Sequence, residues 1–269
     1  MKELLKRALT GFLYVVLLLG AVFLDENAFD FLFLVFGLVC IYEFRRIVKL
    51  KGPYIFIAFL ILWWLFIYVI KSPNAIWGLL IPCILINLNL LANLYEHEPK
   101  KWNTTNLFLI GLFYIGGGFI FLTMIPYGEN RFDKLLIIGI FILIWVNDSF
   151  AYLVGRTFGR HKLFERISPK KTIEGFLGGV VFALIAAYLL SRYDDSEALS
   201  TVHWLTLGAV VVIAGTFGDL VESKFKRVGK VKDSGAILPG HGGLLDRLDS
   251  LVFAAPFIYF TIQIFKHVS

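Results

Sequence analysis

Cations, carboxylates and glycines are concentrated in the segment 223–249 of a chain that is otherwise strongly apolar. The lysines and arginines of this segment can neutralise phosphate oxygens, and Asp246 and Asp249 can hold a hard cation. Glycines such as Gly242 and Gly243 allow backbone amides to approach an anion closely. This combination of residue types is typical of a site that handles a polyphosphate.

Asp246 and Asp249 precede the last apolar run at a spacing that places both on one face of a helix, one turn apart. Mg²⁺ suits such a pair, because it prefers oxygen ligands and is usually shared between one or two carboxylates and substrate phosphates. The pair can address one cation or two adjacent ones. Asp also favours the first turn of a helix through capping and the helix dipole, so a structural role for either residue stays open.

Asp219 ends the eighth apolar run, and Ser223, Lys226 and Arg227 follow it at helical spacing. If the helix continues, these four side chains share one face that leads from a carboxylate to cations. A basic stripe attracted to anionic lipid would explain the cations but not the carboxylate. The pattern therefore favours a binding site.

Asp148 lies inside the sixth apolar run, next to Asn147. Counting from Leu135 at about 1.5 Å per residue puts it about 20 Å from one membrane surface and about 10 Å from the other. A carboxylate at that depth is costly unless it faces a polar cavity, a cation or a hydrogen-bonding partner. We interpret Asp148 as a site residue; its satisfaction by Asn147, Ser149 or a neighbouring helix is the alternative.

The segment Ser168-Pro169-Lys170-Lys171-Thr172 leads into the seventh apolar run and predicts a helix that starts at Pro169 with Ser168 as its cap. The exposed amides of such a start, together with Lys170 and Lys171, would form an anion site. A basic flank whose lysines reach the membrane surface is the alternative. The glycine spacing of a Walker-type loop is absent from this segment.

The elements that must position these residues are membrane spans. With 58% hydrophobic and 17% charged residues, the 269-residue chain differs from soluble globular proteins, of which roughly 25% is charged. Its apolar runs approach or exceed the roughly 17–25 residues that a spanning helix needs. The nine predicted spans are about 8–24, 28–44, 54–70, 75–94, 105–125, 135–154, 176–191, 203–219 and 250–265.

The distribution of basic residues predicts the orientation. With a cytoplasmic N-terminus, 21 of the 26 lysines and arginines fall on the cytoplasmic side. This split favours an all-α integral membrane protein of about nine transmembrane helices, with the N-terminus cytoplasmic and the C-terminus outside. The net charge of +6 reflects the same bias and does not indicate nucleic-acid binding.

The two halves of the chain differ in their loops. Residues 1–134 carry about five spans joined by short loops, whereas residues 135–269 carry two long cytoplasmic loops, about 155–175 and 219–249. We therefore expect the catalytic region in the second half. Cys40 and Cys83 lie in separate apolar runs and predict neither a disulfide nor a zinc site.

The polar motifs resemble those of the phosphatidate cytidylyltransferase, or CDP-diglyceride synthetase, family. The matching residues are Ser223, Lys226-Arg227, Lys232-Asp233, Gly235, Leu238-Pro239, His241-Gly242-Gly243 and Asp246-Arg247-Leu248-Asp249. Asn147-Asp148 and the segment 168–175 are also similar to family features. The amino-terminal half resembles the family only in size and hydropathy.

The resemblance implies a magnesium-dependent nucleotidyltransferase of phospholipid biosynthesis, at the cytoplasmic face of the cell inner membrane. Its reaction would convert CTP and phosphatidate into CDP-diacylglycerol and pyrophosphate; whether it works as a homo-oligomer is left open. The implied metal ligands are Asp219, Asp246 and Asp249, with Asp148, Lys226 and Arg227 as further catalytic residues. The implied substrate contacts are Asn147, Ser168, Lys170, Lys171, Ser223, Lys232, Asp233, His241, Gly242, Gly243 and Arg247.

The nucleophile in such a reaction needs little help from a base. A phosphate monoester has a second pKa of about 6, so the lipid phosphate is largely dianionic near neutral pH. We therefore expect positioning and charge neutralisation to supply most of the rate, and we assign no base role to His241.

Two other functions stay open at the level of sequence. A CTP-dependent polyprenol kinase would transfer the γ-phosphoryl group and release CDP instead of pyrophosphate. A secondary transporter could use Asp148 in an ion path, but transporters tend to show two similar halves with binding groups near the midplane. Here the halves are dissimilar, and the polar residues are concentrated on one face.

Overall fold

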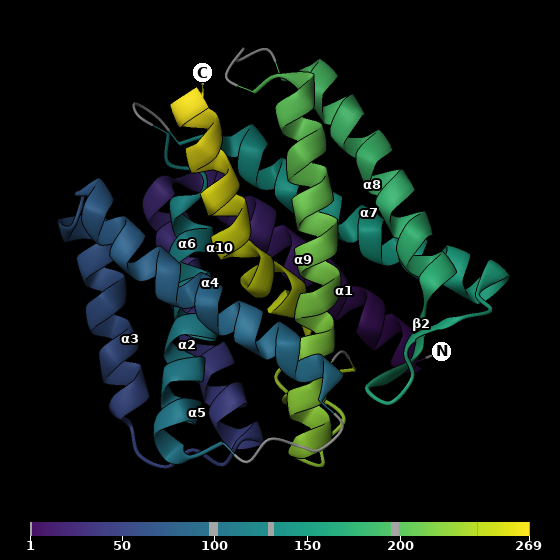
Figure 1. Ribbon diagram of the computed structural model, residues 1–269, viewed down its shortest axis with the longest axis horizontal. Helices are drawn as coiled ribbons and strands as arrows, with labels where there is room; N and C mark the ends of the chain where they lie inside the picture. Colours follow the sequence, from purple (N-terminus) through teal and green to yellow (C-terminus); the bar gives the residue numbers. More distant parts are fainter. Residues whose placement is uncertain (1, 97–101, 129–131, 195–198, 241, 269) are drawn as a thin grey trace.

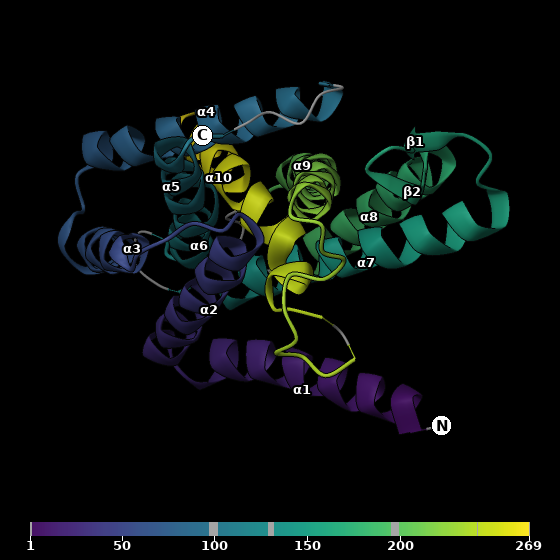
Figure 2. The same cartoon turned by 90° about the horizontal axis from the view of Figure 1, so that it is seen from below.

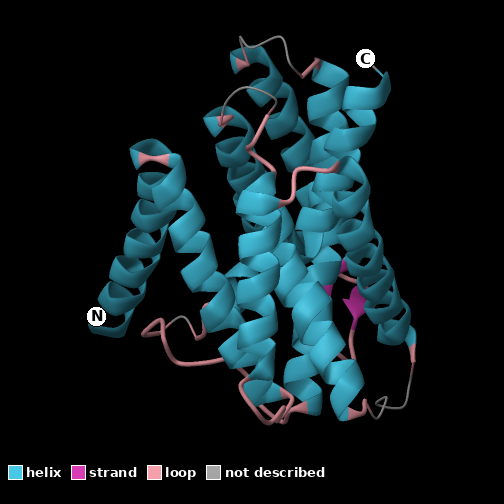
Figure 3. Cartoon of the chain, turned by 90° about the vertical axis from the view of Figure 1, so that its left-hand side faces the viewer, coloured by secondary structure: helices cyan, strands magenta, loops and turns pink. Residues whose placement is uncertain are grey.

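The protein is a bundle of long helices (Figure 3). The computed structural model describes residues 2–96, 102–128, 132–194, 199–240 and 242–268, with the backbone alone for 2–8 and 268. The helices are α1 (Lys2–Leu24), α2 (Glu26–Ile47), α3 (Tyr54–Trp64), α4 (Pro73–Tyr95), α5 (Thr104–Ile110), α6 (Gly117–Met124), α7 (Lys134–Phe158), α8 (Ile173–Tyr193), α9 (Thr201–Val228) and α10 (Leu245–Val268). Two π-helical stretches, η1 (Leu65–Val69) and η2 (Gly111–Gly116), extend α3 and join α5 to α6. Two short strands, β1 (Lys162–Phe164) and β2 (Ser168–Thr172), complete the described elements.

Every predicted span coincides with a helical segment of the described residues. Seven of these segments are long and apolar enough to cross a membrane, and two shorter apolar helices, Leu9–Leu24 and Tyr54–Val69, match the first and third predicted spans. The prediction of an all-α, multi-pass membrane protein is confirmed. The number of crossings and the sides on which the termini lie stay predictions.

Two helices extend beyond the predicted apolar runs, and both extensions carry polar residues. α9 begins with a reciprocal cap, in which Ser200 Oγ accepts from His203 N and His203 Nδ1 accepts from Ser200 N, both at 3.3 Å. It then runs without a break past Asp219 to Val228, as the helical spacing of its polar residues predicts. α10 starts at Leu245, so Asp246 lies in its first turn.

α10 packs at the centre of the bundle, against α9, α6, α4 and α2 (Figures 1 and 2). Glycines allow the closest of these approaches. A Cβ at Gly218 would lie 2.6 Å from Phe253 Cβ and 2.9 Å from the carbonyl oxygen of Asp249, so only glycine fits there. A Cβ at Gly118 would lie 2.5 Å from a backbone oxygen of α10. The close contact between α9 and α10 brings their polar ends together.

The loop after α7 forms a hairpin where a helix start is predicted. Strands β1 and β2 pair antiparallel, and α8 begins only at Ile173. Thr172 caps α8, since its hydroxyl oxygen accepts from Gly175 N at 3.1 Å. The prediction that the helix starts at Pro169 with Ser168 as its cap is therefore wrong. The residue before proline avoids the helical region, and both strands of a hairpin are edges that tolerate proline, so this segment is extended.

Both predicted regions of the chain contribute to one bundle. α10 from the second region packs against α2, α4 and α6 from the first, and α1 packs against α2 and α7. Figure 2 shows α1 along one side of the bundle, next to the loop that connects α9 to α10. Thr10 Oγ1 of α1 donates to the carbonyl oxygen of Pro239 in that loop at 3.2 Å. Helices of the first region therefore border the polar segment of the second.

Candidate active site

A cavity of about 680 Å³ collects many of the predicted site residues. Its walls come from α1, α7, β2, α9 and the first turns of α10. The predicted site residues that line it are Asn147, Asp148, Lys170, Lys171, Asp219, Lys226, Asp246, Arg247 and Asp249. Segments that are far apart in sequence thus converge on one mixed-charge cavity.

α9 presents one polar face to this cavity. Ser223 Oγ donates to Asp219 Oδ1 at 3.1 Å, across one turn of the helix. Lys171 Nζ of β2 lies 2.7 Å from Asp219 Oδ2 and donates at 3.4 Å to the carbonyl oxygen of Thr216. The lysine of the hairpin is therefore already paired with the carboxylate of α9, and the two segments are held together by this contact.

Lys226 lies between two carboxyl groups. Its ammonium is 2.6 Å from Asp246 Oδ1 and also pairs with Glu222, one turn earlier on α9. The Glu222 side chain is 1% exposed, so Lys226 is its charge partner in a nearly dry environment. This arrangement gives Lys226 a structural role beside the phosphate contact that the resemblance implies.

Asp246 organises the loop before α10. Its Oδ2 accepts from Gly243 N and Ser234 N, both at 2.8 Å, and from Ser234 Oγ at 3.0 Å. Asp246 therefore has the capping role that the sequence left open, in addition to its position on the cavity wall. Asp249, one turn further on, is 7% exposed and accepts from the backbone N–H of Ser250 at 2.7 Å.

Asn147 and Asp148 reach the cavity from α7. Asp148 is exposed and lines the cavity, and Asn147 Nδ2 donates to its Oδ1 at 3.4 Å. The Oδ1 of Asn147 is buried and has no hydrogen-bond partner in the described part of the chain. A Cβ at Gly179 of α8 would lie 2.3 Å from that oxygen, so glycine makes room for the amide. The amide oxygen of Asn147 therefore faces α8, and its amide nitrogen faces Asp148.

Seven predicted site residues are not among the residues that line this cavity: Ser168, Ser223, Arg227, Lys232, Asp233, Gly242 and Gly243. His241 lies outside the described residues. Arg227 donates through Nε to the carbonyl oxygen of Ile167 at 3.4 Å, which fixes α9 to the hairpin loop.

The glycines of the loop serve a tight turn. Gly242 has a φ of +87°, which favours glycine, and forms a bridge with Leu238. The approach of phosphate oxygens to this turn stays a prediction.

The donor set is chemically suited to a hard cation. Asp148, Asp219 and Asp249 line one cavity, and Asp249 has no ion-pair partner in the described part of the chain. No three His, Cys, Asp or Glu side chains of the described residues form a cluster that could hold a metal by themselves. Mg²⁺ commonly takes only one or two carboxylates and completes its shell with water and substrate phosphates, so the residues present fit this ion.

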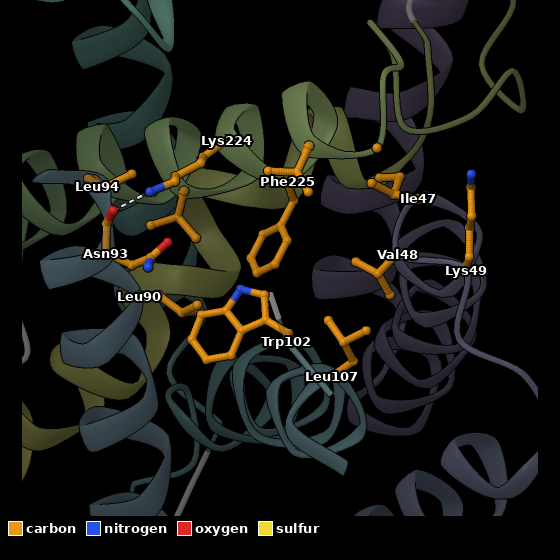
Figure 4. A pocket seen from close by; sticks show the side chains of 13 residues that line it. Ile47, Val48, Lys49, Leu90, Asn93, Leu94, Trp102, Leu107, Lys224 and Phe225 are labelled. Carbon is orange, nitrogen blue, oxygen red and sulfur yellow. Dashed lines mark hydrogen bonds between the residues drawn. The ribbon is translucent and has the colours of Figure 1, made fainter. Parts of the chain in front are cut away.

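A second cavity, of about 410 Å³, lies on another side of α9 (Figure 4). Apolar side chains dominate its wall, and Phe225 and Trp102 point toward each other across it. Lys224 extends along it and donates to the carbonyl oxygen of Asn93, near the end of α4. Arg166 donates to the carbonyl oxygens of Leu94 and Glu96 at the same helix end. Lys224 therefore helps to cap α4 and does not line the mixed-charge cavity.

Sequence reasoning missed two acidic residues beside the site, Glu43 and Glu222. Glu43 falls inside the predicted span 28–44, where an ionisable residue signals a functional or structural polar contact. Glu222 precedes Lys226 by one helical turn, and that spacing was the signal for their ion pair.

The fold and this cavity define a class of protein: a multi-pass membrane protein with a site of paired carboxylates and cations built by its helix ends. The sequence profile of the cytidylyltransferase family matches residues 5–265. The chain therefore belongs to the cytidylyltransferase family and is a nucleotidyltransferase enzyme.

Characterised relatives agree with this assignment. Phosphatidate cytidylyltransferase of Bacillus subtilis (strain 168) is 34% identical over an alignment of 271 residues. The alignment covers 99% of this chain and 100% of the relative. The proteins of the same name from Staphylococcus saprophyticus and Staphylococcus aureus (strain COL) are 43% and 44% identical over 153 residues, 56% of this chain and of each relative. Neither a polyprenol kinase nor a transporter is supported.

Proposed function

We propose that this enzyme is a phosphatidate cytidylyltransferase, which converts CTP and phosphatidate into CDP-diacylglycerol and pyrophosphate. The observation that carries the proposal is the convergence of α7, β2, α9 and α10 on one cavity that combines carboxylates with lysines in a membrane bundle. A site for a lipid phosphate and a nucleotide must be reachable from the bilayer and from water. The family match and the names of the relatives support the same reaction.

In this reaction an oxygen of the phosphatidate phosphate forms a bond to the α-phosphorus of CTP. The bond from that phosphorus to the oxygen bridging toward the β-phosphorus breaks, and pyrophosphate leaves. The attacking phosphate is already largely dianionic near neutral pH, because its second pKa is about 6. No side chain has to remove a proton, so the residues must bring two anions together and hold them in line.

The chain supplies cations from two elements for that purpose. Lys170 and Lys171 of β2 and Arg247 of α10 face the cavity and can bind phosphate oxygens. Lys171 pairs with Asp219 in the structure, so binding of a triphosphate would replace this carboxylate partner of the lysine with a phosphate.

Asp219 and Asp249, with Asp148 beside them, are the residues that would hold Mg²⁺, alone or with a second cation. When bound, such an ion would neutralise phosphate charge and polarise the α-phosphate. Asp246 lies on the same cavity wall and would contribute to Mg²⁺ binding from there. Its Oδ2 already accepts three hydrogen bonds from the loop.

We infer that the enzyme resides in the bacterial cell membrane with this cavity open to the cytoplasm. The basic loops between α7 and α8 and between α9 and α10 both contribute to the cavity, and basic residues beside spans are retained on the cytoplasmic side. CTP would then enter from the cytoplasm, and phosphatidate from the bilayer.

The test is turnover by the purified protein in detergent micelles that contain phosphatidate, with CTP labelled at the cytosine and at the γ-phosphate. The expected products are a cytosine-labelled lipid and γ-labelled pyrophosphate in equal amounts. A γ-labelled lipid with free CDP would indicate a kinase and contradict the proposal, as would the absence of turnover at any Mg²⁺ concentration.

A further inference from the structure

A carboxyl group from the amino-terminal region lies against the loop between α9 and α10 and the start of α10. Glu43, near the end of α2, is 1% exposed. Its Oε1 accepts from Leu244 N at 3.1 Å, and its Oε2 accepts from Leu245 N and Ser234 Oγ, both at 2.8 Å. The partners are about two hundred positions away in sequence, at the start of α10 and in the loop before it.

The partners of Glu43 are unusual for a buried carboxyl group. No lysine, arginine or histidine of the described residues pairs with it. Its oxygens are satisfied by backbone N–H groups at the start of α10, which have no partner within their own helix. The positive end of the α10 dipole adds a favourable interaction with this carboxyl group. Helices usually obtain this cap from a local side chain, so a cap from α2 fixes α10 to a distant element.

The loop glycines make room for Glu43. A Cβ at Gly235 would lie 2.3 Å from Glu43 Oε1. A Cβ at Gly243 would lie 2.4 Å from Glu43 Oε2 and 2.0 Å from Ser234 Oγ. Gly235 and Gly243, two glycines of the motif that resembles the family, are therefore required by a contact with α2, whatever they do for a phosphate.

Ser234 connects Glu43 to the cavity wall. Its Oγ lies 2.8 Å from Glu43 Oε2 and 3.0 Å from Asp246 Oδ2, and its single hydroxyl proton can be donated to one of them at a time. Asp246 in turn pairs with Lys226 of α9. A continuous polar network thus leads from α2 through the loop to α10 and α9.

We propose that Glu43 is a positioning residue for the nucleotidyl transfer, which holds the start of α10 so that Asp246 and Asp249 face the cavity. The inference rests on the proposed function, because its test measures kcat and KM for the proposed reaction. It assigns a part in the site to the amino-terminal region, which the family profile covers as well as the polar motifs of the second region.

The test compares two buried carboxyl groups of the same helix. Glu43→Gln replaces one acceptor oxygen with an NH₂ group that must face a backbone N–H. Asp30→Asn is the matched control, because Asp30 is 4% exposed on α2 but accepts from the hydroxyls of Tyr127 and Tyr68 at the opposite end of the helix. The measurements are kcat and KM for CTP, the thermal unfolding midpoint, and amide hydrogen exchange by peptide.

The expected result for Glu43→Gln is a fall in kcat of more than about tenfold, as when a positioned group is lost from an active site. Exchange should accelerate in peptides that cover residues 242–249 and stay unchanged in α7 and α8. Asp30→Asn should leave kcat and the exchange of residues 242–249 as in the wild type. Faster exchange throughout the bundle, or unchanged exchange at 242–249, would overturn the proposal.

If Glu43→Gln does not fold, Glu43→Asp carries the same test, since it keeps the charge but withdraws the carboxyl oxygens by one methylene from Leu244 N and Leu245 N. A several-fold lower kcat with an unchanged unfolding midpoint supports the proposal, and wild-type kcat overturns it. An inactive wild-type enzyme would refute the proposed reaction instead, while the hydrogen-exchange comparison would still decide the role of Glu43.

Discussion

Two cavities flank the last turns of α9, and their cations contact different partners. In the mixed-charge cavity, Lys171 and Lys226 pair with carboxylates that also line its wall. In the apolar cavity, Lys224 donates to a backbone carbonyl at the end of α4 (Figure 4). Lysines on the same stretch of one helix thus serve different purposes. A cation paired with a side-chain carboxylate can exchange that carboxylate for a phosphate. A cation that caps a helix end stabilises the fold.

The sharpest test of this difference removes a carboxylate from the mixed-charge cavity. Asp249→Asn keeps the shape of the side chain and removes its charge, so we expect loss of activity by a factor of about 10³ or more with folding preserved. Asp246→Asn and Asp219→Asn should be similarly inactive. The measurement is incorporation of labelled CTP into lipid over a range of Mg²⁺ concentrations.

His241→Gln is the matched comparison from the same loop. It should retain a measurable fraction of activity, because the attacking phosphate carries its own negative charge. If His241→Gln is as inactive as Asp249→Asn, the mechanism without a general base is wrong.

Removal of Lys226, the cation between two carboxyl groups, should lower stability in addition to activity. Lys226→Met leaves Glu222 buried without its partner, and the expected cost is about 3–5 kcal/mol of unfolding free energy. Chemical denaturation in detergent measures this loss. The double variant Lys226→Met/Glu222→Gln should recover much of it, and a double variant as unstable as the single one would contradict this pairing.

Substitution of the two hairpin lysines tests whether activity depends on one specific contact or only on the net charge of the strand. Lys171→Met removes the partner of Asp219, and we expect activity to fall by about 10- to 100-fold, with KM for CTP raised. Lys170→Met is the neighbouring control: Lys170 is exposed and forms no ion pair within the described residues, so its effect should be smaller. Equal effects of the two substitutions would show that only the net charge of the strand matters.

The smallest effect is expected in the apolar cavity. Lys224→Ala removes one of the groups that satisfy the end of α4 and should lower the unfolding free energy by about 1 kcal/mol. Activity per folded molecule should stay within about twofold of the wild type, as for a group outside the reaction site. A tenfold loss of activity without loss of stability would instead place Lys224 in the reaction, and the contrast between the two cavities would fail.

The apolar runs and the helical spacing of the polar residues were sufficient to predict the helices and much of the cavity wall. The spacing from Asp219 to Lys226 and from Asp246 to Asp249 implies shared helix faces, and both pairs line the cavity. The start of α8 was predicted wrongly, because Ser168 and Pro169 suit a helix cap and a strand edge equally well. Pairing with β1 decided between them.

The sequence by itself determined the class of protein, its helices and the carboxylates and cations of its site, because hydropathy and helical periodicity are local properties. Only the tertiary structure decided the partners of those groups: Lys171 with Asp219, Lys226 between Glu222 and Asp246, and Glu43 beneath the start of α10. A buried carboxyl group must find donors wherever the packed helices place them. Those donors can lie about two hundred positions away, so no local pattern in the sequence reveals them.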